Sequence, residues 1–103
     1  MLDPKILIRN AIEALIDDIS KNPQLFEHTA KSMLNNLGIE SSLDVVLGYM
    51  VGMCQGSVSS MVDYAVVEFD ISNPDDLIIE IMEDVFRKII ELREIMISQR
   101  IHE

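Results

Sequence analysis

The stretch GYMVGMCQGSVSS, residues 48–60, decides how the middle of this chain folds. It places Gly48, Gly52 and Gly56 four residues apart, and Ser60 continues the row. Residues four apart share one side of an α-helix, each about 40° further round than the last. A glycine inside a helix costs about 1 kcal/mol relative to alanine, so three cost roughly 3 kcal/mol. We therefore expect an offsetting contact, of which close approach of a second backbone is the usual kind.

The glycine row lies within a long apolar stretch that predicts a helix over residues 42–69. Ser41 and Asp44 resemble a capping box at its start. Up to about Val58 this helix is nearly free of charge all round, which is typical of a central, buried helix. Its main apolar stripe recurs at three- and four-residue steps, on roughly the opposite side from the glycines. The stripe consists of Leu43, Val46, Leu47, Met50, Val51, Cys54, Val58, Met61, Val62, Ala65 and Phe69.

Three alternatives are open for the glycine row. Another helix of the same chain could pack closely against it. The same helix of a second copy could cross it. It could also form a groove for an apolar or extended ligand.

The other helices are marked by a capping residue followed by proline, a combination typical of helix starts. It occurs at Asp3-Pro4, Asn22-Pro23 and Asn73-Pro74. We predict helices over residues 4–20, 23–37 and 74–100, and Gly38 is expected to end the second of these.

The last predicted helix carries more apolar surface than one small domain can cover. A seam of apolar residues alternates by four and three positions, a heptad-like pattern. Further apolar residues widen the band to over half of the circumference, which predicts a partner surface. The seam consists of Ile78, Met82, Val85, Ile89, Leu92 and Met96.

The sequence thus predicts an all-α protein with a single helical domain over residues 1–103. The expected architecture is a four-helix antiparallel bundle, in which two long helices form a hairpin and two short helices cover one side. The glycine row and the wide band together favour a homodimer, the commonest kind of oligomer. The predicted interface consists of Gly48, Gly52, Gly56, Ser60, Ile78, Met82, Val85, Ile89, Leu92 and Met96.

Charge excludes some partners. Eight Lys and Arg against eighteen Asp and Glu give a formal net charge of −10, so no broad basic surface for nucleic acid can form. The same charge disfavours anionic membranes. Cys54 is the single cysteine, which fits a reducing compartment. We see no signal peptide and no apolar window near the roughly 20 residues of a membrane span, and we expect a soluble cytoplasmic protein.

Candidate catalytic groups are few. Carboxylates recur at helical spacing on the last predicted helix, at Glu80, Glu83, Asp84, Glu91 and Glu94. The Glu-x-x-His motif of helical di-metal sites is absent from the sequence, and nearby Arg87 and Lys88 predict surface ion pairs. His28 and His102 are expected to be exposed, and Cys54 to lie in the core.

We therefore predict no cofactor and no metal. The predicted function is a non-catalytic, self-associating interaction or scaffold module, with a further protein partner as a possibility. The alternative is a helical enzyme or metal-binding protein that uses carboxylates of the last helix or Asp63, so whether the chain is an enzyme stays open.

Overall fold

The computed structural model describes residues 3–101, which form four helices and contain no strand. The helices are α1 (Pro4–Lys21), α2 (Pro23–Asn36), α3 (Leu43–Phe69) and α4 (Pro74–Ile101). Each end lies within one residue of the prediction, and the all-α class is confirmed.

The helix ends follow from local capping chemistry. The side chain of Asp3 accepts a hydrogen bond from the Lys5 backbone N–H at 3.0 Å, and the side chain of Asn22 accepts one from the Leu25 N–H at 3.2 Å. Ser42, rather than the predicted Ser41, caps α3 by accepting from the Val45 N–H at 3.3 Å. Gly38, at φ +78°, ends α2 as predicted, because this left-handed conformation suits a residue without a Cβ.

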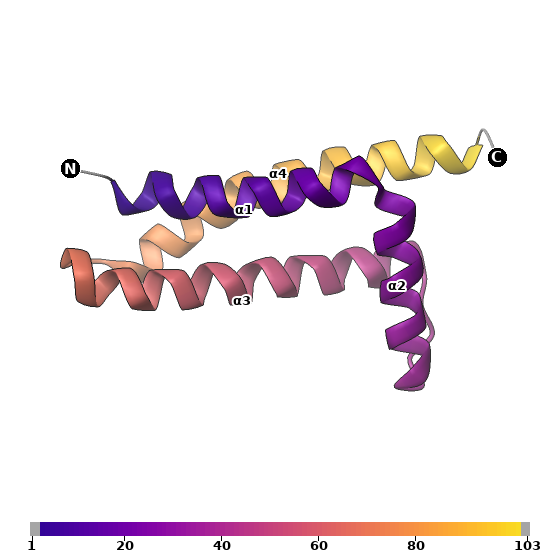
Figure 1. Cartoon of the computed structure of the whole chain (residues 1–103), viewed down its shortest axis with the longest axis horizontal. Helices are drawn as coiled ribbons and strands as arrows, with labels where there is room; N and C mark the ends of the chain where they lie inside the picture. The colour runs from indigo at the N-terminus through magenta and orange to yellow at the C-terminus, as the bar shows by residue number, and fades with distance from the viewer. Residues whose placement is uncertain (1–2, 102–103) are drawn as a thin grey trace.

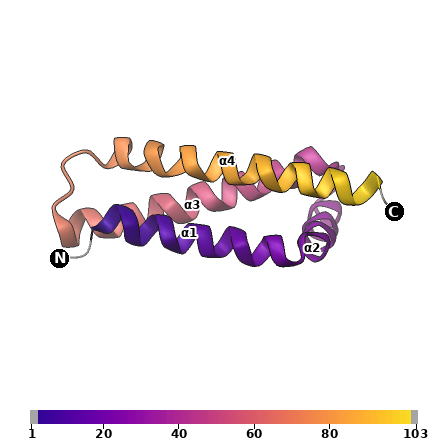
Figure 2. The ribbon, with the colours of Figure 1, turned by 90° about the horizontal axis from the view of Figure 1, so that it is seen from above.

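Three long helices lie alongside one another in a molecule of 48 × 28 × 18 Å (Figure 1). α1 and α4 run in the same direction as neighbours, and α3 lies beneath them in the opposite direction (Figure 2). Ion pairs fix the parallel register of α1 and α4: Lys5 pairs with Glu80, and Arg9 Nε lies 2.8 Å from Asp84 Oδ2. From the first pair to the second, the residue number rises by four on both helices, as it must when two helices run parallel.

α2 departs from the predicted antiparallel arrangement. It turns away from α1 at a single residue, Asn22, and crosses one end of the molecule instead of lying along it (Figure 1). Its buried Ala30 and Leu34 pack against Val46 near the start of α3. The lower end of α2 continues beyond α3, so the molecule has the outline of a bar with a short arm at one end (Figure 1).

The core lies between α1, α3 and α4. Each helix contributes one stripe, and the buried set contains no polar or charged residue within the described part of the chain. Met50, Val58 and Val62 of α3 have no exposed surface at all. The residues at the centre of the core also include Ile8, Ile12, Ile16, Cys54, Ile81, Val85, Ile89, Leu92 and Met96.

Candidate interaction surface

The glycine row lies on the outer face of α3, turned away from α1 and α4. Gly48, Gly52, Gly56 and Ser60 are all exposed. A Cβ atom added to any of the three glycines would meet nothing within 4 Å. Close packing against another helix of the same chain, the first of the three alternatives, is therefore wrong. The expectation of a helix buried on all sides is wrong for the same reason, because only the inner face of α3 is covered.

The outer face of α3 consists mainly of small and apolar residues. Residues 45–62 carry no charge, and the row is flanked by partly exposed Val45 and Tyr49. Beyond Ser60 the surface continues over Tyr64, which is 70% exposed, and Val67, which is 83% exposed. Asp63 is exposed on the same side, near the end of the face. We call this surface, residues 45–67 on the side of the glycines, the outer face of α3.

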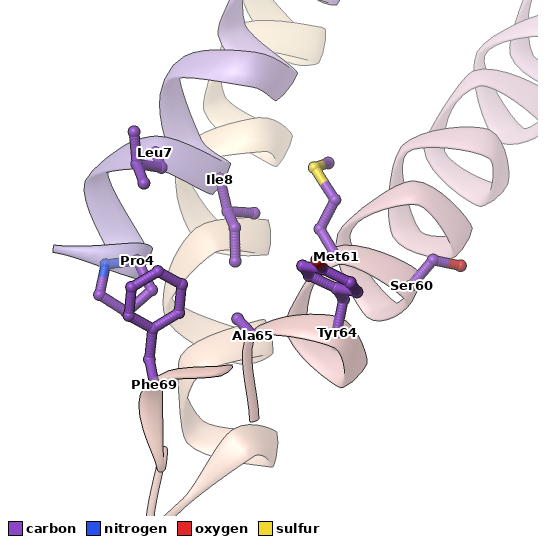
Figure 3. Close-up of a pocket in the computed structure, with 8 residues that line it drawn as sticks. All are labelled: Pro4, Leu7, Ile8, Ser60, Met61, Tyr64, Ala65 and Phe69. Atoms are coloured by element: carbon purple, nitrogen blue, oxygen red, sulfur yellow. The ribbon is translucent and has the colours of Figure 1, made fainter. Parts of the chain in front are cut away.

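A pocket of about 380 Å³ opens beside the far end of this face, between α3 and the start of α1. Figure 3 shows Leu7 and Ile8 of α1 on one side, Met61 and Tyr64 of α3 on the other, and Ala65 between them. Pro4 and Phe69 close one end, and Ser60 lies at the rim (Figure 3). The lining is almost entirely hydrocarbon, so the pocket suits an apolar side chain better than a polar ligand.

The α4 part of the predicted interface lies inside this chain. Met82, Val85, Ile89, Leu92 and Met96 are buried in the core, and Ile78 packs against it. The seam therefore holds the three long helices together rather than presenting a surface. The surplus apolar surface of α4 lies instead at the edge of the band, where Ile79, Phe86 and Ile90 are 57%, 43% and 60% exposed.

Two of the five candidate carboxylates of α4, Glu80 and Asp84, form ion pairs with cationic side chains. Asp84 contacts both Arg9 of α1 and Arg87, while Lys88 reaches Asp17 of α1 at 3.8 Å. Arg87 and Lys88 thus both form ion pairs, but each with a different partner from the ones that its four-residue spacing predicts. Among residues 3–101 no three His, Cys, Asp or Glu side chains lie close enough to hold a metal ion.

The remaining reactive side chains lie apart from the outer face of α3. Cys54 is fully buried, as predicted, and burial raises the pKa of its thiol. His28 is exposed, and His102 lies outside the described residues. No pair of a nucleophile and a base is formed by these groups in the described part of the chain.

Two features of this surface were not foreseen from the sequence: the pocket and the projecting end of α2. The pocket depends on how α1 lies over α3, which local patterns do not encode. For the projecting end the sequence does contain a signal: the apolar residues Leu37 and Ile39 flank Gly38 in an otherwise polar turn. They are 74% and 43% exposed. No protein-family model, curated protein or solved structure matches this chain.

By length and composition α3 could also cross a membrane, which the sequence windows had not indicated. The core helix of a soluble protein passes the same test. Of the apolar window of α3, 33% is buried inside the chain, where its inner face packs against α1 and α4.

Proposed function

We propose that this protein is a non-catalytic, self-associating helical module, and that two copies meet through the outer faces of α3. The observation that carries the proposal is that the glycine row is open on this face. Three helix-weakening residues lie where the chain itself makes no use of their small size. A second helix approaching closely is the kind of contact that a row of small residues permits.

The distribution of charge also favours the outer face of α3 as the surface where two copies meet. Each copy carries a formal charge of −10, so two copies repel each other over most orientations. Residues 45–62 of α3 carry no charge, so the repulsion is smallest where these segments face each other. Tyr49 and Val45 add exposed apolar area beside the row.

We also propose that the protein acts in the cytoplasm. Two ion pairs, Lys5–Glu80 and Arg9–Asp84, join α1 to α4. These are the two helices that cover the inner face of α3. Inserting α3 into a bilayer with this packing intact would carry those charges into the hydrocarbon, which is costly.

The test is the mass of the natural chain in solution, measured by light scattering coupled to size exclusion over a range of concentrations. We expect twice the chain mass of 11.7 kDa at high concentration. Gly52→Leu should leave a folded monomer, because the new side chain has open space within its own chain but blocks close approach of a second helix. Ala14→Leu, at an exposed alanine of α1, is the matched control and should still dimerise.

A natural chain that stays monomeric at every concentration would refute self-association and leave the outer face of α3 for a different protein or an apolar ligand. A Gly52→Leu variant that dimerises like the natural chain would show that association uses another surface.

A further inference from the structure

We infer that the apolar pocket between α1 and α3 receives the projecting end of α2 from the second copy. This inference rests on the proposed self-association and specifies how the two copies fit together. We call the projecting end the α2 arm. It comprises residues 33–39, in which Met33, Leu37 and Ile39 are 48%, 74% and 43% exposed.

The glycine row is complementary to itself across a two-fold axis. In an antiparallel crossing about a two-fold axis, Gly52 of one copy faces Gly56 of the other, and Gly48 faces Ser60. All four small positions then meet another small position, and the axis passes at the level of residue 54. Such self-complementary contacts are what a two-fold dimer requires.

The same symmetry places α2 of one copy level with the pocket of the other. Within one chain α2 meets α3 at Val46, and its Phe26 stacks on Tyr49 with ring centroids 6.3 Å apart. About the same axis, residues 46 and 49 of the second copy lie level with residues 62 and 59 of the first. The pocket is formed on α3 at Ser60, Met61, Tyr64 and Ala65, which is the same level.

The contact with α2 and the pocket lie on the same flank of α3. At about 100° per residue, Val46, Tyr49, Ser60 and Tyr64 project within roughly 60° of one another. The two-fold axis lies in the plane of contact, so a feature on one flank stays on that flank in the second copy. The α2 arm extends beyond α3, away from α1 and α4 (Figure 1). In the proposed dimer it therefore points toward the pocket of the other copy.

The area of contact gives an independent reason for a second point of attachment. The outer face of α3 is about 33 Å long and about 10 Å wide, which gives roughly 330 Å² per copy. A stable dimer of standard size buries about 800 Å² per partner. The helix crossing alone falls short, and two arms seated in two pockets supply a large share of the difference.

Cysteine cross-linking tests the fit directly. A Leu37→Cys chain mixed with a Tyr64→Cys chain should form a disulfide-linked pair under mild oxidation. Either variant alone should not, because the two Leu37 positions lie about 24 Å apart along α3 and the two Tyr64 positions about 30 Å apart, at about 1.5 Å per residue. Leu37→Cys mixed with Ile90→Cys on α4 is the negative control, and the natural chain with buried Cys54 shows the background.

A charge substitution gives a second readout. Leu37→Asp should raise the dimer dissociation constant at least tenfold, while Leu25→Asp, at an exposed leucine nearer the α1 end of the same helix, should leave it unchanged. A dimer in which the Leu37 and Tyr64 cysteines do not cross-link, or in which Leu37→Asp has no effect, would overturn the arm-in-pocket contact while self-association stands. A monomeric natural chain would overturn both.

Discussion

Replacing the glycines of α3 by alanine should have opposite effects on folding and on association. Gly52→Ala adds one methyl group on an exposed side of the helix, with nothing within 4 Å inside the chain. Alanine is favoured over glycine in a helix interior by about 1 kcal/mol. The free energy of unfolding of the monomer should therefore rise by about 1 kcal/mol, and its Tm by roughly 4–8 °C for a domain of this size.

The same methyl group should weaken the dimer. In the antiparallel crossing Gly52 of each copy faces Gly56 of the other, so the substitution adds a methyl group at two places in the contact. Overpacking a close contact costs at least about 1 kcal/mol per site, or about 2 kcal/mol for the symmetric pair. Since about 1.4 kcal/mol is a tenfold change, the dissociation constant should rise roughly 30-fold.

The two effects need separate assays, because dimerisation itself stabilises the folded state. Thermal unfolding is followed by circular dichroism well below the dissociation constant, and association by sedimentation equilibrium. Ala14→Gly, at an exposed alanine of α1, is the matched control: glycine is disfavoured in a helix interior by about 1 kcal/mol, so that variant should lose monomer stability without an effect on association. An unchanged dissociation constant for Gly52→Ala would refute close approach at the row, and a lower Tm of the dilute monomer would refute the open space beside Gly52.

Three further predictions test other parts of the structure. Raising the salt concentration from about 20 mM to about 0.5 M should tighten the dimer, because salt screens the repulsion between copies of charge −10; weaker association measured by light scattering would contradict this. Cys54 should react with a thiol reagent far more slowly in the native than in the urea-unfolded chain, because it is buried and its pKa is raised. Equal rates would place it outside the core. Ile81→Ala should lower the free energy of unfolding by about 2–5 kcal/mol in denaturant titrations, and Ile90→Ala by much less, because Ile81 is 1% and Ile90 60% exposed.

The helices could be predicted from the sequence because their signals are local. A capping residue before proline and a glycine after the last apolar residue act within a few residues, and they placed the starts of α1, α2 and α4 and the end of α2 to within one residue. The direction of α2 is not local in this sense. It depends on the backbone of Asn22, at φ −146° and ψ 74°, and on the contact of Ala30 and Leu34 with Val46.

The candidate surface was predicted in part. The sequence distinguished two sides of the third helix, but whether the chain covers the second side depends on the positions of α1 and α4. On α4 the apolar band is wider than the core can cover, so periodicity alone cannot identify which apolar residues are buried. Ile81, Val85 and Leu92 are buried in the core, whereas Ile79 and Ile90 are exposed at the surface.

Stability and the proposed association place opposing demands on α3. Its inner face needs apolar side chains, and Met50, Val58 and Val62 are completely buried in the core. Its outer face would favour alanine or a charged residue if the chain folded only for itself, because either would raise helix stability or solubility. The outer face instead carries glycine, serine, valine and tyrosine without charge over residues 45–62. A sequence shaped by monomer stability alone does not explain this choice, whereas a face that meets its own copy accounts for both the small residues and the missing charge.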